Sequence, residues 1–202
     1  MMNKKAFEMS IGMIVIIILS VLIFSLSLYF VFKWFGSAEE LKAQIDRQTQ
    51  EQIVAALQTG NQLVAIPIAV QDAKRGASAN FGVGIRNINV DKDFSLALGF
   101  SGAYQPDGKT IDCDPAYIEQ YWLGSFSSVD IGRIKKNELK VVPFLIKADL
   151  NVAPGKPAPA GDYIFNVCVF DGLPAPCNIE QFKVSSGAFY TGKIYQVTVK
   201  VA

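Results

Sequence analysis

The sequence contains no histidine, and neither sign of charge is in large excess. Its 19 lysine and arginine residues nearly balance 18 aspartate and glutamate residues, which leaves a formal net charge of +1. Without histidine the chain cannot build Ser-His-Asp or Cys-His nucleophile systems or the common histidine-containing zinc sites. Without a basic excess it lacks the electrostatic attraction on which nucleic-acid-binding proteins depend. We therefore expect no catalytic residues, no cofactor and no nucleic-acid partner.

Apolar residues are abundant and make up 50% of the chain. The 24 residues from Met9 to Phe32 carry no charge, and a helix needs about 20 apolar residues to cross a bilayer. No small-residue cleavage site of a secretory signal follows this run, so we expect it to be retained as a transmembrane helix over 9–35. A helix buried in a soluble core is the alternative, but its whole circumference would then need apolar neighbours.

Charges on either side of the predicted span indicate its orientation. Lys4 and Lys5 precede the span, whereas Lys33 after it is followed by two glutamates. Basic residues favour the cytoplasmic side, so residues 1–8 are expected to form a cytoplasmic tip. The remainder of the chain would then lie outside the cytoplasm. These features predict a single-pass protein of the cell membrane that contacts membrane lipid through one helix.

Residues 37–60 are predicted to form a short amphipathic stalk helix. A Ser-x-x-Glu capping box occupies 37–40, and an apolar stripe runs through the glutamine-rich segment, with Leu41, Ile45, Ile53, Ala56 and Leu57. Two placements of the stripe remain open: it packs against a partner helix or a neighbouring copy, or it lies on the protein's own β domain. Thr49 interrupts the stripe and favours the second placement.

From residue 62 onward, apolar and polar residues alternate, and Gly, Pro, Asn and Asp separate the runs, as in antiparallel β domains. We expect about seven strands, near 62–70, 81–85, 94–100, 122–134, 139–148, 163–169 and 194–201. Pro67 and Pro143 predict edge or bulged strands, because proline has no amide hydrogen for the ladder. Short strands in this number favour a two-sheet sandwich over 62–202.

The three cysteines are Cys113, Cys168 and Cys177. A location outside the cytoplasm permits a disulfide, and the proline-rich turn between Cys168 and Cys177 makes these two the preferred pair. Pairing of Cys113 with one of the others is the alternative, because spacing does not fix geometry. With three thiols and no C-x-x-C motif, we expect no metal site.

Two sets of side chains are candidates for function. The carboxylates Asp107, Asp112 and Asp114 surround a turn and could offer oxygen ligands to calcium or a glycosidase pair, but their spacing misses the EF-hand pattern. We interpret them as a solvated turn. The aromatic-rich stretch after this turn is the candidate interaction surface, because aromatic anchors dominate interface energetics; its residues are Tyr117, Tyr121, Trp122 and Phe126. Core packing is the alternative for the same side chains.

The stretch Lys-Lys-Ala-Phe-Glu-Met-Ser before the span resembles the class III signal peptides of archaeal type IV pilin-like proteins, in which a basic pair precedes a small residue, a cleavage point and a glutamate. The resemblance implies processing after Ala6, with Phe7 as the first mature residue, and a role for Glu8 in filament assembly. Glu8 would be the second mature residue, whereas pilins ordinarily carry this glutamate at the fifth. The alternative is that Lys4, Lys5 and Glu8 form the polar flank of a signal anchor.

The run Gly-Asp-Tyr-Ile-Phe-Asn-Val over 161–167 resembles the G-x-Y-x-F-x-V strand of immunoglobulin-like domains, which implies that Tyr163 closes a tyrosine corner. The predicted architecture as a whole is also similar to the membrane-anchored β-sandwich stator subunits of the archaellum. These resemblances imply a structural or protein-interaction protein of the cell envelope, without enzymatic activity, that contacts other proteins or copies of itself. The alternative is a receptor module that binds carbohydrate or the surface layer.

Overall fold

The computed structural model describes residues 12–13, 15–27, 47–59 and 62–202. The chain divides into two compact units, residues 1–44 and 45–202. In the first unit, residues 12–13 and 15–27 are helical, and their apolar side chains are exposed. Among the described residues, no helix is both long enough and apolar enough to cross a membrane. The other residues of the predicted span, the cytoplasmic tip with Lys4 to Glu8, and residues 37–46 of the predicted stalk lie outside the described residues.

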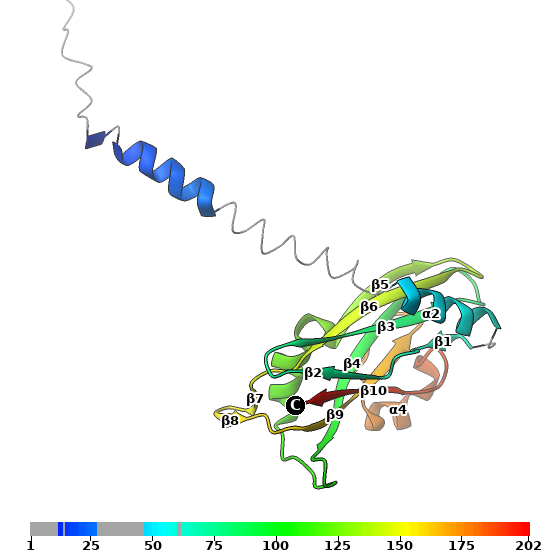
Figure 1. Cartoon of the computed structure of the whole chain (residues 1–202). Coiled ribbons are helices and arrows are strands. Elements are labelled where there is room, and N and C mark those ends of the chain that lie inside the picture. The colour runs from blue at the N-terminus through cyan, green and yellow to red at the C-terminus, as the bar shows by residue number, and fades with distance from the viewer. Residues whose placement is uncertain (1–11, 14, 28–46, 60–61) are drawn as a thin grey trace, which may run out of the picture. The chain divides into compact units, whose positions relative to one another are not determined.

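The second unit is mainly β, as the sequence predicts (Figure 1). Its three-stranded sheet is antiparallel, in the order β1 (Val64–Ala65), β3 (Ser78–Arg86) and β6 (Leu139–Lys147). Its five-stranded sheet has the order β2 (Val70–Ala73), β10 (Tyr195–Val201), β9 (Gly161–Phe170), β4 (Lys92–Tyr104) and β5 (Ser128–Ile134). In this sheet β2 and β10 run parallel, which the prediction of an antiparallel domain missed. A small hairpin of β7 (Asn151–Ala153) and β8 (Lys156–Pro157) precedes β9.

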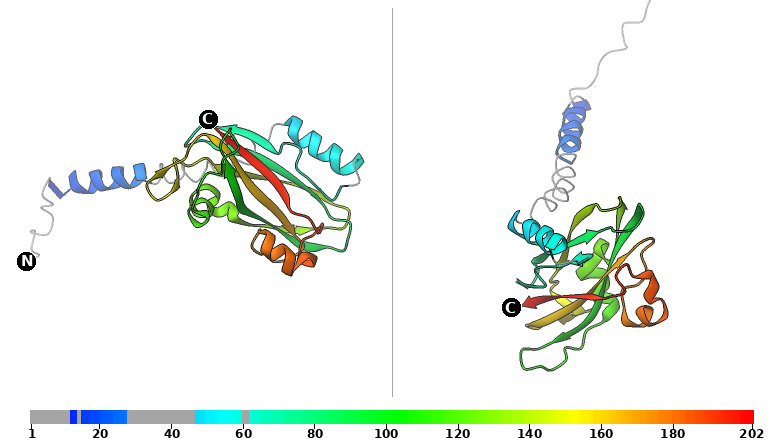
Figure 2. Two further views of the ribbon diagram at one scale, coloured as in Figure 1. Left: turned by 90° about the horizontal axis from the view of Figure 1, so that it is seen from below. Right: turned by 90° about the vertical axis from the view of Figure 1, so that its right-hand side faces the viewer.

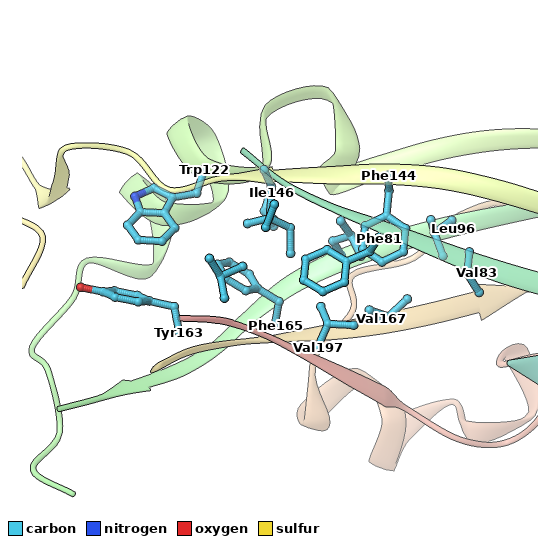
Figure 3. Close-up of a cluster of buried hydrophobic side chains, with 14 of the residues drawn as sticks. Phe81, Val83, Leu96, Trp122, Phe144, Ile146, Tyr163, Phe165, Val167 and Val197 are labelled. Carbon is cyan, nitrogen blue, oxygen red and sulfur yellow. The ribbon is translucent and has the colours of Figure 1, made fainter. Parts of the chain in front are cut away.

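Side chains from both sheets meet in one buried cluster (Figure 3). Phe81 of β3 and Phe144 of β6 stack with their ring centroids 5.5 Å apart. On the five-stranded sheet, Phe165 of β9 and Val197 of β10 belong to the same cluster. The alternation that predicted these strands therefore also identifies their inner faces, because successive side chains in a strand point to opposite sides.

The predicted strand over 62–70 is divided at Pro67. Before the proline, β1 pairs with β3, and after it β2 pairs with β10, so the chain changes from one sheet to the other. A residue without an amide hydrogen suits this break in the ladder. Pro143 lies in β6, which is an edge strand of the three-stranded sheet, and this prediction is confirmed.

The helix α2 (Arg47–Thr59) packs on the outer face of the three-stranded sheet. Ile53 and Leu57 are completely buried in a cluster that also contains Ala65. A side chain at Gly84 would clash with Ile53 and Leu57, so the helix sits directly on the backbone of β3. Figure 2 shows α2 (cyan) and α4 (Ile179–Val184, orange) on opposite sides of the strands. The described part of the predicted stalk therefore lies on the protein's own β domain, which was the second placement.

The predicted strand over 122–134 is wrong in its first half. Only β5 is extended, and the preceding residues form α3 (Pro115–Ile118), the π-helical turn η1 (Glu119–Leu123) and the 3-10 turn η2 (Gly124–Ser127). The carboxylate of Asp114 caps α3 by accepting the amides of Ala116 and Tyr117, and a proline at the first helical position suits the helix start. A short apolar run does not by itself distinguish helix from strand.

Candidate interaction surfaces

The four aromatic residues predicted to form an interaction surface are divided between core and surface. Trp122 is only 1% exposed. Its Nε1 donates to the carbonyl of Asn151 at 2.9 Å, and its ring lies on Tyr163 with the centroids 4.5 Å apart (Figure 3). Phe126 is half-buried and packs against the same core. The prediction is therefore wrong for Trp122, because its indole finds both apolar and hydrogen-bonding partners inside the domain.

The predicted tyrosine corner is confirmed. The hydroxyl of Tyr163, near the start of β9, donates to the carbonyl of Pro159 at 2.8 Å. Burial raises the pKa of Tyr163, so this hydroxyl stays protonated and remains a donor over the physiological pH range. Trp122 and Tyr163 together fill the core beneath the insertion, the name used here for residues 105–127 between β4 and β5.

Two aromatic side chains of the insertion remain on the surface. Tyr117 and Tyr121 are one helical turn apart, and their ring centroids lie 4.3 Å apart with an interplanar angle of 31°. Tyr121 is 49% exposed, and Tyr117 is half-buried. The turn η1 directs Trp122 and Leu123 inward and leaves Tyr121 at the surface. This tyrosine pair is therefore the exposed part of the predicted interaction surface.

Each of the three aspartates of the acidic turn has a different partner. Asp107 pairs with Lys109 at 2.9 Å, Asp112 pairs with Lys156 at 2.7 Å, and Asp114 caps α3. Hydrogen bonds from these lysines lower the pKa of the Asp107 and Asp112 carboxyls. In the part of the chain that the structure describes, no group of three or more cysteine and carboxylate side chains is arranged to hold a metal ion.

Cys168 and Cys177, the pair that the sequence favours, are joined by a disulfide, and Cys113 is free. The disulfide lies in a second buried cluster on the outer face of the five-stranded sheet. There, a side chain at Gly99 would clash with the carbonyl of Cys177, so the connection is packed directly on β4. Burial raises the pKa of the Cys113 thiol to about 11, which makes it a poor nucleophile at neutral pH.

A second surface lies where β4 begins, at the other end of this strand from the insertion. Three connections meet there: the turn 87–91 between β3 and β4, the turn 135–138 between β5 and β6, and the segment 171–194 between β9 and β10. The last of these contains α4 and the short turn η3 (Ser186–Ala188). We call this surface the loop end.

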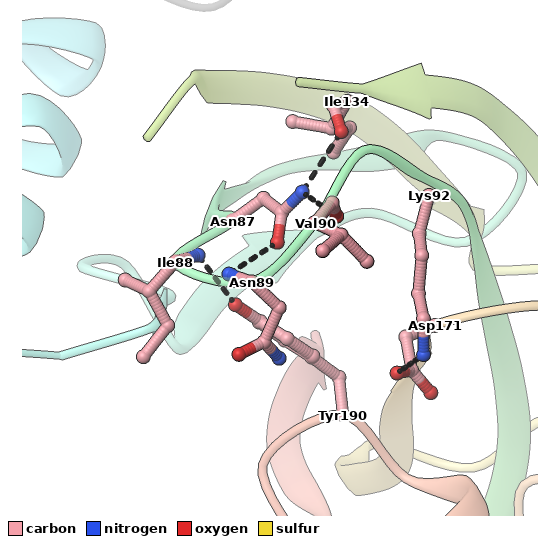
Figure 4. A network of polar contacts seen from close by, with 8 residues as sticks. All are labelled: Asn87, Ile88, Asn89, Val90, Lys92, Ile134, Asp171 and Tyr190. Atoms are coloured by element: carbon pink, nitrogen blue, oxygen red, sulfur yellow. Dashed lines mark hydrogen bonds and ion pairs between the residues drawn. The ribbon is translucent and has the colours of Figure 1, made fainter. Parts of the chain in front are cut away.

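The buried Asn87 joins two of these connections (Figure 4). Its Nδ2 donates to the carbonyls of Val90 at 2.9 Å and Ile134 at 2.8 Å. Its backbone also bonds to the other turn, because the amide of Asn137 donates to the Asn87 carbonyl at 2.6 Å. Through its side chain and its backbone together, Asn87 thereby holds the turn 87–91 against the end of β5 and the turn 135–138 that follows it.

Tyr190 and an ion pair join the segment 171–194 to the turn 87–91 and the start of β4 (Figure 4). The Tyr190 hydroxyl donates to the carbonyl of Arg86 at 2.7 Å. It also accepts the amide of Ile88 at 3.2 Å, as Figure 4 shows. Lys92 and Asp171 form an ion pair of 2.8 Å. The loop end is thus held by hydrogen bonds of Asn87 and Tyr190 and by one ion pair, although it contains little regular structure.

The held turns expose aliphatic side chains. Leu173 is 90% exposed, Val90 65% and Ile88 44%. These residues do not stand out in the sequence, because isolated apolar residues in turns are ordinary on protein surfaces. The available signals were the Asn-Ile-Asn-Val-Asp run over 87–91 and a leucine between glycine and proline at 173.

Comparisons with known proteins show no family. No protein-family model matches the chain, and no curated protein matches it. Solved structures match only distantly. The alkylpurine DNA glycosylase AlkC of Pseudomonas fluorescens is 8% identical, with a TM-score of 0.36 over 69% of this chain and 30% of its own. The class 5 fimbriae chaperone CfaA is 12% identical, with a TM-score of 0.33 over 68% of this chain and 55% of its own.

A Niemann-Pick type C2 protein from Japanese carpenter ant is 9% identical, with a TM-score of 0.32 over 69% of this chain and 89% of its own. The chain spans about half the length of the chaperone and less than a third of the glycosylase. With TM-scores below 0.5 and these identities, the matches carry no argument about fold or activity.

Proposed function

We propose that this chain is a single-pass, membrane-anchored protein of the cell envelope, without enzymatic activity, whose β domain lies outside the cytoplasm and binds proteins or copies of itself. The Cys168–Cys177 disulfide is the observation that carries the location, because disulfides persist in oxidising compartments. The uncharged run from Met9 to Phe32 and the lysines before it support the anchor and its orientation.

The helical residues 15–27 add support for the anchor. The hydroxyls of Ser20, Ser25 and Ser27 each donate to a backbone carbonyl within the helix at 2.8 Å. Polar groups in hydrocarbon need such internal partners, because no water is present to satisfy them.

The location is tested with the full-length chain in membranes of a bacterial expression host. We expect the chain to resist alkaline carbonate extraction, and protease added to spheroplasts should digest the β domain. A matched variant with Lys4→Glu and Lys5→Glu should reduce this digestion, because the basic flank determines orientation. Release by carbonate, or a β domain that is protected from protease in the unaltered chain, would contradict the proposal.

We also propose that the chain is pilin-like, on the basis of Lys4, Lys5, Ala6, Phe7 and Glu8 before the predicted span. The intact mass and N-terminal residue of the protein from its native membrane decide between two roles. A chain that begins at Phe7 indicates prepilin-type processing and a filament subunit. A chain that keeps Lys4 and Lys5 indicates a permanent signal anchor and a static envelope component.

We further propose that the β domain is an immunoglobulin-like sandwich. In support, β9 and β10 pair in one sheet with β4 and β5, whereas β3 and β6 belong to the other, as in immunoglobulin-like domains. The hydroxyl bond of Tyr163 provides independent support. The disulfide differs from that of antibody domains, which joins the two sheets, because Cys177 lies in the connection that follows β9.

The tyrosine pair is the surface that we assign to protein contacts. Tyrosine brings a large, rigid apolar face and a hydroxyl, and it is enriched among residues that dominate binding energy. The variant Tyr117→Ala/Tyr121→Ala should lose copies or partner proteins that co-purify with the full-length chain after cross-linking in its membrane. Tyr104→Ala, which removes an exposed tyrosine from β4, is the matched control. Unchanged association in the double variant would contradict the assignment.

A receptor for carbohydrate or the surface layer is the second candidate, since exposed tyrosine rings also offer flat apolar faces to a ligand. Soluble envelope polysaccharide distinguishes the two. For a receptor, the polysaccharide should bind the unaltered chain but not the double tyrosine variant. For a protein-interaction surface, the unaltered chain and the double tyrosine variant should not differ in polysaccharide binding.

A further inference from the structure

The loop end combines exposed aliphatic side chains with ammonium groups that lack ion-pair partners. Val90 and Ile88 project from the turn 87–91, and Leu173 projects from the neighbouring segment. The turn 135–138, which is bonded to the first turn through Asn87, carries Lys135 and Lys136. Within the described residues, neither of these lysine side chains takes part in an ion pair.

The carboxylates near these lysines have other partners: two accept backbone amides, and one forms an ion pair with Lys92. Asp91 accepts the amide of Lys136 at 2.9 Å, and Glu138 accepts the amide of Lys135 at 2.7 Å. Asp171 is paired with Lys92. These carboxylates keep their negative charges while they fix the backbone of the turns. Lys135 and Lys136 are exposed, and their ammonium groups have no ion-pair partner among the described residues, so they can contact an anionic partner.

The residue types at the loop end favour a lipid over a protein. Residues that dominate protein interfaces are enriched in Trp, Tyr and Arg, whereas Leu, Val and Lys are under-represented there. Aliphatic side chains beside lysines are instead typical of surfaces that enter the boundary between lipid headgroups and acyl chains. Leu173 and Val90 lie in turns and are 90% and 65% exposed, so both side chains can reach a surface that the domain meets.

We propose that the loop end is a second membrane contact, which docks on an anionic bilayer surface. Ile88, Val90 and Leu173 enter the acyl boundary, and Lys135 and Lys136 meet lipid phosphates. This inference rests on the proposed anchor. Residues 28–46 between the described helical parts number 19, so the connection spans at most about 65 Å. The anchor thus keeps the domain close to the membrane and makes docking an intramolecular event.

The test uses the full-length chain with Cys113→Ser, reconstituted into vesicles. An environment-sensitive fluorophore is attached at Val90→Cys, and the control carries it at Ser125→Cys on the exposed surface of the insertion. In vesicles of phosphatidylglycerol and phosphatidylcholine, brominated acyl chains should quench the fluorophore at 90 and leave it unquenched at 125. With phosphatidylcholine alone, quenching at 90 should largely disappear.

The lysines are tested in the same anionic vesicles. Lys135→Ala/Lys136→Ala should lower the docking equilibrium by about 30-fold, because each lysine near an anionic surface contributes roughly five-fold. Lys109→Ala, which removes an exposed lysine from the insertion, should change nothing.

Each other outcome has a defined meaning. An anchored chain whose fluorophore at 90 is not quenched would overturn the docking proposal alone. Shielding of position 90 that depends on the protein-to-lipid ratio, and not on lipid charge, would assign the loop end to contacts between copies and would also overturn it. A chain that carbonate removes from the vesicles would instead contradict the proposed anchor.

Discussion

At one end of β4, the insertion presents a tyrosine pair above the buried Trp122, and at the other end the loop end presents aliphatic side chains above the buried Asn87. Both surfaces are held from beneath by a buried side chain that donates to a backbone carbonyl: Trp122 to Asn151, and Asn87 to Val90 and Ile134. Both ends are therefore preorganised. The two ends differ in the chemistry that they expose. One end is aromatic, and the other carries aliphatic side chains and lysines that form no ion pair among the described residues. We infer different partners from that difference.

The largest expected effect separates the core residue of the insertion from its surface residue. Trp122→Ala should lower the free energy of unfolding by about 3–5 kcal/mol, because it leaves a cavity beside Tyr163 and removes the bond to Asn151. Tyr121→Ala should change it by no more than about 0.5 kcal/mol. Urea titration followed by circular dichroism measures both. Equal losses in the two variants would show that the tyrosine pair belongs to the core.

Removal of the disulfide should lower the stability of the domain and should increase local opening at the loop end but not in the insertion. Cys168 and Cys177 are nine residues apart, and opening a loop of this size should lower the free energy of unfolding by about 3 kcal/mol. In a Cys168→Ser/Cys177→Ser variant, hydrogen exchange through local opening should accelerate over 171–194 and stay unchanged in the insertion. If hydrogen exchange accelerated to a similar extent in the insertion and in 171–194, the two ends would not open independently of each other.

Asn87→Ala should loosen two of the connections together. The carbonyls of Val90 and Ile134 lose their donor, which should cost about 2 kcal/mol. Amide exchange should rise in both 87–91 and 135–138. The control is Asn89→Ala. Asn89 is exposed and lies in the same turn, and it bonds Asn87 through its backbone N–H, which the substitution keeps. If only one of the turns responds, Asn87 does not couple them.

The smallest effect concerns the free thiol. Because burial raises the pKa of Cys113 to about 11 from 9.0, iodoacetamide should label it slowly at pH 8 in the folded protein and rapidly after denaturation. Between these pKa values the unfolded chain loses the proton first, so stability should fall as pH rises above 9. Mass spectrometry of labelled protein measures the first expectation, and rapid labelling in the folded state would contradict it.

The sequence predicts the regular parts of the β domain well. Alternation at Phe81, Val83 and Ile85 identifies both β3 and its buried face, since the period of a strand is two residues. Pro143 indicates an edge strand because proline has no amide hydrogen to donate to a neighbouring strand. The preferred cysteine pair follows from a short, proline-rich spacing.

Irregular segments explain the remaining errors. Trp122 lies in a short apolar run that suits a strand or a helix equally, and only the three-dimensional neighbours Tyr163 and Asn151 show that it is buried. Asn87 has the sequence character of an ordinary turn residue, yet it is completely buried. Exposure of Val90 and Leu173 depends on how three connections distant in sequence meet, and no local pattern encodes that.

Site-specific photo-crosslinking in the native membrane tests the assignment of different partners most directly. A diazirine amino acid placed at position 121 or at position 173 of the full-length chain is irradiated, and the adducts are identified by mass spectrometry. We expect protein adducts from position 121 and phospholipid adducts from position 173. Protein adducts at 173 in place of lipid, or only lipid adducts at 121, would contradict the division of partners between the two ends of the domain.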